Sequence, residues 1–221
     1  MVIDCRGLVI GPAGRRVPWL TIGITTVVCA AAMWARAIQA ESADDLLQVT
    51  RLTSVLMAAG AAVCLEDGNE LVTAATPFGR LRRRLVAVLL TGLVTVACWL
   101  LVVTGAAAVL NAPSGDPSLP VGALLIELVA LMAFGWLLAA ILMNRSSWRG
   151  SGMRAGLGVI IAALVTISVA RTAKWLWPMP GHGWAEAHER WAAIAIVSIA
   201  VLIVTSRDPA TRLGTQRKVI P

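Results

Sequence analysis

Long apolar stretches alternate with short polar connections along this 221-residue chain. A helix needs about 20 mostly apolar residues to cross the hydrocarbon core of a membrane. Six stretches approach or exceed that length, and the second of them is short and opens with Thr50 and Arg51. They predict transmembrane helices over residues 17–38, 50–65, 85–110, 119–143, 157–177 and 191–205.

The composition supports the same fold class. Hydrophobic residues make up 58% of the chain and charged residues only 14%, and the mean hydropathy is +0.79. Water does not solvate such a chain as a compact globule. We therefore predict an all-α fold, a polytopic bundle of six transmembrane helices forming a single domain over residues 1–221. The tails, 1–16 and 206–221, are too short to fold as further domains.

The basic residues predict the orientation in the membrane. Cytoplasmic loops of membrane proteins carry an excess of Lys and Arg. With the N-terminus inside, all but five of the 19 basic residues fall on the cytoplasmic side. We therefore expect a multi-pass protein of the cell membrane with both termini cytoplasmic, and we attribute the net charge of +7 to topology, not to nucleic-acid binding. The five exceptions are Arg36, Arg51, Arg171, Lys174 and Arg190.

The chain carries no motif for catalysis. It contains neither a phosphate-binding G-x-x-x-x-G-K-[ST] loop nor the zinc motif H-E-x-x-H. The four cysteines form no C-x-x-C pair, and we interpret them as small apolar packing residues. We therefore predict that the chain is not an enzyme and that it binds no cofactor or metal itself.

The outer connection between the last two predicted helices is interrupted over residues 178–190 by two prolines and two glycines. Tryptophan favours the membrane interface, so the tryptophans here are interpreted as an aromatic belt or, alternatively, as an outer gate above a substrate path. His182 and His188 are interpreted as wet interfacial residues, with a metal site alongside Glu186 and Glu189 as the alternative. The tryptophans are Trp175, Trp177, Trp184 and Trp191.

Ionisable side chains within the membrane are costly, so each is a candidate functional residue. Glu127 lies roughly 12 Å below the outer end of the fourth predicted helix, and Arg171 roughly 9 Å below that of the fifth, at 1.5 Å per residue. The matching depths suggest an intramembrane ion pair between Glu127 and Arg171. The alternative is that Arg171 and Lys174 extend outward to the interface.

Residues 64–85 separate the second and third predicted helices on the cytoplasmic side. Asp67 and Glu70 have the spacing of a helix-capping box. Leu71 continues the short helix, and Pro77 ends it. A helix of roughly two turns is not stable alone, so it must pack on something. Arginines follow at positions 80, 82, 83 and 84.

This order of features resembles the permease subunits of bacterial ABC exporters, the six-span group that exports drugs, peptides and polysaccharides. In that family the helix between spans two and three is the coupling helix, which docks on a separate ATPase subunit. The chain departs from the family in residues 1–16, where glycines and a proline break the periodicity of the expected amphipathic helix. Within the loop 66–84, the resemblance assigns coupling to Glu66, Asp67, Glu70, Leu71, Thr76, Pro77 and Arg80.

The resemblance implies partners and a function. The ATPase subunit would bind ATP and Mg, and a second permease, either a copy of this chain or a different one, would complete the transport path in the lipid bilayer. The exported substrate would be hydrophobic or amphipathic, such as a peptide, drug or lipid-like molecule. The alternative is a membrane protein that does not transport but scaffolds or regulates a complex.

Overall fold

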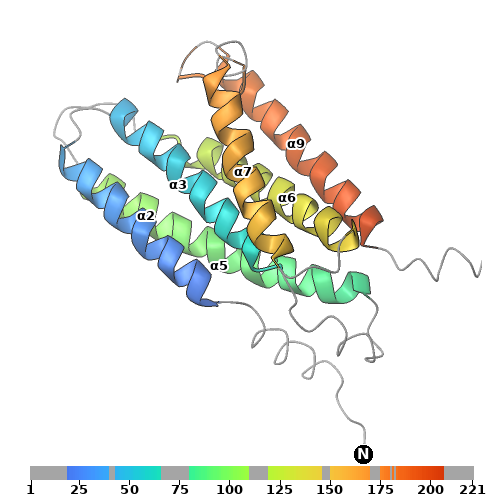
Figure 1. The fold of residues 1–221 in the computed structure, drawn as a ribbon. Coiled ribbons are helices and arrows are strands. Elements are labelled where there is room, and N and C mark those ends of the chain that lie inside the picture. The colour runs from blue at the N-terminus through green and yellow to red at the C-terminus, as the bar shows by residue number, and fades with distance from the viewer. Residues whose placement is uncertain are drawn as a thin grey trace, which may run out of the picture.

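The structure is a computed structural model, which describes residues 19–39, 43–65, 80–109, 119–145, 150–169, 175–179, 181 and 183–206. Six helices in the described part are long and apolar enough to cross a membrane, and this part contains no strand. The chain is therefore an all-α, multi-pass membrane protein, as its hydrophobic pattern predicted (Figure 1). The helices are α2 (Trp19–Gln39), α3 (Ala43–Val63), α5 (Arg80–Val109), α6 (Val121–Arg145), α7 (Ser151–Ser168) and α9 (Trp184–Thr205).

Several helix boundaries differ from the prediction because hydropathy underweights polar helical turns. Both α3 and α9 begin seven residues earlier than expected, at Ala43 and Trp184. Helix α7 ends at Ser168, nine residues before the predicted end, because Val169 adopts an extended conformation. Since α9 already includes residues 184–190, the interruption predicted over residues 178–190 is shorter than expected.

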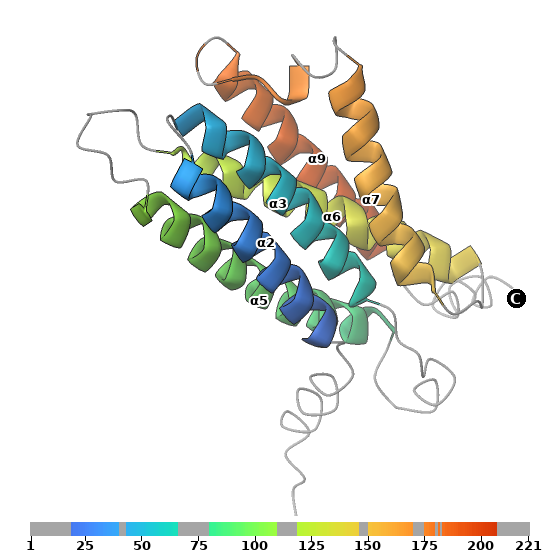
Figure 2. The same ribbon diagram turned by 60° about the vertical axis from the view of Figure 1, so that its left-hand side comes forward.

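Two helices, α3 and α6, form the centre of the bundle. The protein buries 72% of the α3 membrane segment and 61% of that of α6, against 22 to 33% for the other four. Helix α3 packs against α2, α5, α6 and α7, whereas α6 packs against α3, α5, α7 and α9. Both views show α2 and α5 on one side of α3, with α7 and α9 on the other (Figures 1 and 2). A displacement of α3 would therefore change its contacts with four of the other five helices.

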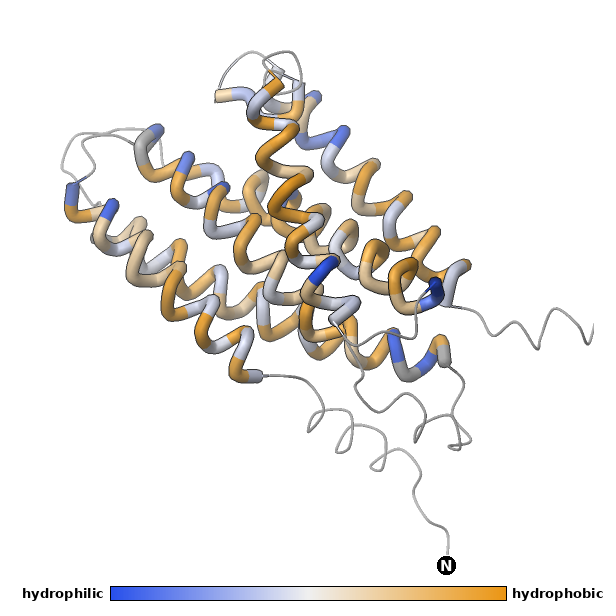
Figure 3. Tube along the Cα trace, in the orientation of Figure 1, coloured by the Kyte–Doolittle hydropathy of each residue, from blue (hydrophilic) through white to orange (hydrophobic). Residues whose placement is uncertain are grey.

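Successive helices run in opposite directions, so the helix ends gather at two ends of the bundle (Figure 1). Helices α2, α5 and α7 begin, and α3, α6 and α9 end, at what we call the Trp19 end. The other is the Trp184 end. Hydrophilic positions concentrate near these two ends, and hydrophobic positions fill the length between them (Figure 3). This distribution is that of a protein whose middle lies in hydrocarbon.

The outer helices direct large apolar side chains away from the protein. A soluble monomer rarely exposes continuous apolar surface of this extent. The exposed side chains lie on all four outer helices, and this surface is where lipid contacts the protein. Examples are Leu20 and Val27 of α2, Leu89 and Leu93 of α5, Met153 and Ile161 of α7, and Ile196 and Val197 of α9.

Small residues let the helices approach α3 closely. A Cβ atom added to Gly156 of α7 would lie 2.9 Å from the carbonyl oxygen of Ala59 in α3. One added to Gly135 of α6 would lie 3.1 Å from the Cβ of Ala62. Lipid supplies no hydrophobic force between helices, so such backbone proximity provides much of the packing energy.

We expect Gly156→Ala to destabilise the bundle by about 1–3 kcal/mol, because the added methyl group meets backbone that cannot rotate away. Gly23→Ala is the matched control, since a Cβ at Gly23 of α2 would have no atom within 4 Å. Thermal unfolding in detergent should show a lower midpoint for Gly156→Ala alone. Equal midpoints for the two variants would show that the α3–α7 contact is looser than described.

Candidate functional site

Arg51 of α3 and Glu127 of α6 form a buried ion pair inside the bundle, toward the Trp184 end. Arg51 is 3% exposed and Glu127 is fully buried. The Arg51 Nε and Nη2 atoms donate to Oε2 and Oε1 of Glu127, each at 3.2 Å. Two parallel hydrogen bonds of this kind join guanidinium and carboxylate with a fixed geometry. The pair therefore connects the two most buried helices, α3 and α6.

The rest of the Arg51 guanidinium contacts the chain that precedes α9. Nη1 donates to the carbonyl oxygen of Trp177 at 3.3 Å, and Nη2 to that of Pro178 at 2.8 Å. The guanidinium carbon also lies 5.5 Å from the ring centre of Trp177 and 5.4 Å from that of Trp184. Aromatic faces attract cations at these distances. Carboxylate, carbonyls and rings together replace the water that Arg51 has lost.

Residues 175–179, which we call the crossover segment, are held mainly by side chains. Besides the two carbonyls bound by Arg51, those of Trp175 and Leu176 accept hydrogen bonds from Arg190 at 2.9 Å and Trp191 at 2.7 Å. Trp175 and Leu176 are helical, and residues 177–179 are irregular. Carbonyls at a helix end or in irregular backbone are tolerated within a membrane only where the protein satisfies them. Four consecutive carbonyls are satisfied here by three side chains of α3 and α9.

His188 completes the site from α9. Its Nδ1 lies 2.7 Å from the carbonyl oxygen of Trp184, and its Nε2 lies 3.2 Å from Oε1 of Glu127. The residue is 7% exposed, so its interpretation as a wet interfacial residue was wrong. Among the described residues, no group of three or more His, Cys, Asp and Glu side chains could hold a metal ion. His182, the other histidine, lies outside the described residues.

The sequence identified Glu127 as a candidate but not the partner that it has in the structure. Arg171, the partner proposed from matching depths, lies outside the described residues, whereas Arg51 makes the bidentate contact. Arg51 was counted among the basic residues of the outer side, because the helix predicted over residues 50–65 was short and began beside it. Extending that helix to a normal length would have placed Arg51 inside it.

No family model, curated protein or solved structure matches this chain. What the chain does must be argued from the arrangement of its own residues.

The proposed coupling residues lie at the Trp19 end of the bundle or outside the described part. Arg80 is the first residue of α5. Nearby on the same helix, Arg84 donates from Nη2 to Oδ1 of Asn144 in α6 at 3.2 Å, and Asn144 donates to the carbonyl oxygen of Thr205 in α9 at 2.9 Å. A polar link thus joins three helices at this end. Six of the proposed residues lie outside the described part: Glu66, Asp67, Glu70, Leu71, Thr76 and Pro77.

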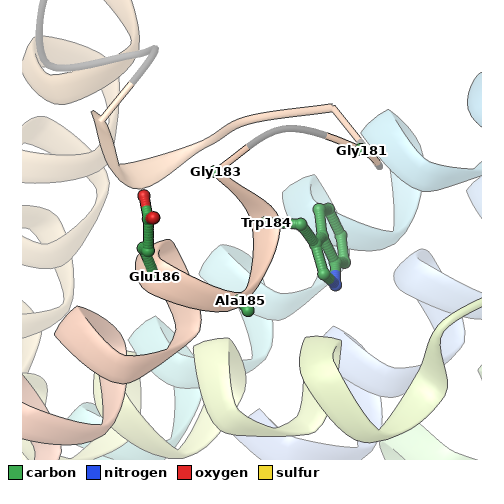
Figure 4. Close-up of a pocket in the computed structure, with 5 residues that line it drawn as sticks. All are labelled: Gly181, Gly183, Trp184, Ala185 and Glu186. Atoms are coloured by element: carbon green, nitrogen blue, oxygen red, sulfur yellow. The ribbon is translucent and has the colours of Figure 1, made fainter.

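An open depression lies at the Trp184 end, beside the buried site (Figure 4). It is lined by Gly181, Gly183 and the first turn of α9. Trp184 and Glu186 point in different directions from that turn. Glu186 is the one charged residue among those that line the depression, and its side chain is 70% exposed. Trp184 is the one lining residue that also contacts Arg51.

We expect Arg51→Met to destabilise the protein by about 3–5 kcal/mol, because it leaves the Glu127 carboxylate buried without a partner. The double variant Arg51→Met/Glu127→Met should recover much of that loss, since an apolar pair of similar size replaces the ions. Arg145→Met, at an exposed arginine of α6, serves as the control. The measurement is the thermal unfolding midpoint of the wild-type chain and of the three variants. If the double variant were no more stable than Arg51→Met, loss of the ion pair would not be the cause of the destabilisation.

Proposed function

We propose that this chain is the membrane-spanning permease subunit of an ABC exporter, located in the cell membrane with both termini cytoplasmic. A separate ATPase subunit would bind residues 66–79 and supply the energy of ATP hydrolysis. The substrate class is hydrophobic or amphipathic, such as a peptide, drug or lipid-like molecule. The support is the resemblance of residues 64–85 to a coupling helix, together with the position of this segment relative to α3.

The observation that carries the proposal is the path from residues 66–79 to the buried ion pair. This segment follows α3 directly at the Trp19 end, and α3 has the most buried membrane segment of the six helices. Arg51 lies toward the opposite end of the same helix. A helix transmits displacement along its axis, so a motor bound at residues 66–79 would act on Arg51 through α3.

The proposed mechanism requires no catalytic residue in this chain. Closure of the ATPase would displace α3, and Arg51 would exchange its contacts with the carbonyls of Trp177 and Pro178 for others. The crossover segment would then open or close the Trp184 end. A second permease, either a copy of this chain or a different one, would complete the path between the two subunits. Buried polar contacts suit such a switch because they have discrete bonded and broken states.

We expect Glu70→Arg, or deletion of residues 67–77, to abolish co-purification with the proposed ATPase subunit, because the substitution reverses a charge of the docking helix and the deletion removes the helix. Glu186→Arg introduces the same charge at an exposed site of the opposite end and should leave the complex intact. Affinity purification from membranes, followed by ATP hydrolysis assays of the purified complex, provides the measurement. An intact complex after the deletion would overturn the coupling proposal. A complex that forms but hydrolyses no ATP would favour the scaffold alternative.

A further inference from the structure

The geometry around His188 fixes which ring nitrogen carries a proton. Nδ1 lies 2.7 Å from the carbonyl oxygen of Trp184, one turn earlier on α9. A carbonyl oxygen can only accept a hydrogen bond, so Nδ1 must donate and therefore bears hydrogen. In a neutral imidazole with hydrogen on Nδ1, the other nitrogen, Nε2, has only a lone pair.

That second nitrogen faces a carboxylate. Nε2 lies 3.2 Å from Oε1 of Glu127, inside the protein. A lone pair and a carboxylate oxygen repel each other, and a buried environment strengthens the repulsion. One additional proton removes the conflict, either as an imidazolium facing the carboxylate or as a carboxylic acid facing the imidazole. The contact is not aligned as a hydrogen bond, so attraction between opposite charges favours the imidazolium form.

Burial and the nearby Arg51 oppose this extra positive charge, and other features of the surroundings favour it. Arg51 and Glu127 already cancel each other, so the added proton leaves the site with one net positive charge. The Trp184 ring lies 4.4 Å from the His188 ring, at a tilt of 44°. Its face attracts a cation, and the carbonyls of Trp177, Pro178 and Trp184 direct their negative ends at Arg51 or His188.

Other charged groups of the described part are directed elsewhere. The charged side chains that act on His188 there are Glu127 of α6 and Arg51 of α3. Arg190 of α9 binds the carbonyl of Trp175. The remaining acidic residues toward the Trp184 end whose side chains are described are exposed, and they are Asp44 of α3 and Glu186 and Glu189 of α9.

We propose that Glu127 and His188 form a proton-binding site within the membrane-spanning bundle, and that the bound proton holds α9 against α6. The proton enters from water at the Trp184 end and leaves the same way, with no other bond made or broken. When the proton is present the contact attracts, and when it is absent the contact repels. Stability of the Trp184 end should therefore fall as the pH rises. This inference holds for a transporter and for a scaffold alike.

Nuclear magnetic resonance of the full chain, labelled with ¹⁵N-histidine and ¹³C-glutamate and embedded in lipid nanodiscs, tests the site directly. The chain has two histidines, so a His182→Gln spectrum assigns His188. At pH about 8 a free imidazole, with a pKa of about 6.5, is mostly neutral. We expect His188 to carry hydrogen on both nitrogens there, or to carry it on Nδ1 while the ¹³C shift of the Glu127 carboxyl reports a protonated acid. A neutral ring beside an ionised Glu127, or hydrogen on Nε2 alone, would overturn the proposal.

A second measurement does not depend on resolved spectra. Thermal unfolding midpoints of the wild-type chain should fall by several degrees as the pH rises from about 7 to about 9. His188→Gln removes the titrating group and should flatten this dependence, whereas His182→Gln should retain it. If the unfolding midpoint depended on pH equally in the wild-type chain and in His188→Gln, the result would contradict proton binding at His188.

Discussion

A charged arginine inside hydrocarbon must be given back the interactions that it loses with water, and Arg51 shows how much structure this requires. Its guanidinium has a bidentate carboxylate, two backbone carbonyls and two aromatic faces around it. These groups come from α6, from the crossover segment and from α9. The Trp184 end of the bundle is thus organised around a single side chain of α3.

The two ends of the bundle are fastened by polar contacts, while the middle is packed by small residues. At the Trp19 end, Arg84, Asn144 and Thr205 link α5, α6 and α9. Between the ends, Gly135 and Gly156 bring α6 and α7 close to α3. Trp99 of α5 and Trp136 of α6 each donate an indole hydrogen bond to α3 in the same region. Under the transport proposal, a displacement of α3 by the ATPase would have to rearrange these contacts.

The hydrophobic pattern predicted the fold class and the six membrane-length helices of the described part, because the bilayer imposes a minimum apolar length on each crossing. It did not predict that α3 and α9 begin two turns earlier, because those turns mix charged and apolar residues and a charged turn can be helical when the fold supplies its partners. Glu127 was recognised as a candidate because a carboxylate in an apolar run is conspicuous. Its contacts with Arg51 and His188 were missed. Those residues lie 76 and 61 positions away in the sequence, on helices whose first residues were predicted seven positions too late.

The central claim is that the Arg51–Glu127 pair holds the crossover segment in place, in addition to joining α3 and α6. Hydrogen–deuterium exchange of the peptide covering residues 175–179 tests this claim most directly, comparing the wild-type chain with Arg51→Met/Glu127→Met. The account predicts that residues 175–179 exchange markedly faster in the double variant, while the central turns of α3 and α6 exchange as in the wild type. The reason is that the carbonyls of Trp177 and Pro178 lose the hydrogen bonds that Arg51 donates. Unchanged exchange at residues 175–179 would contradict the account.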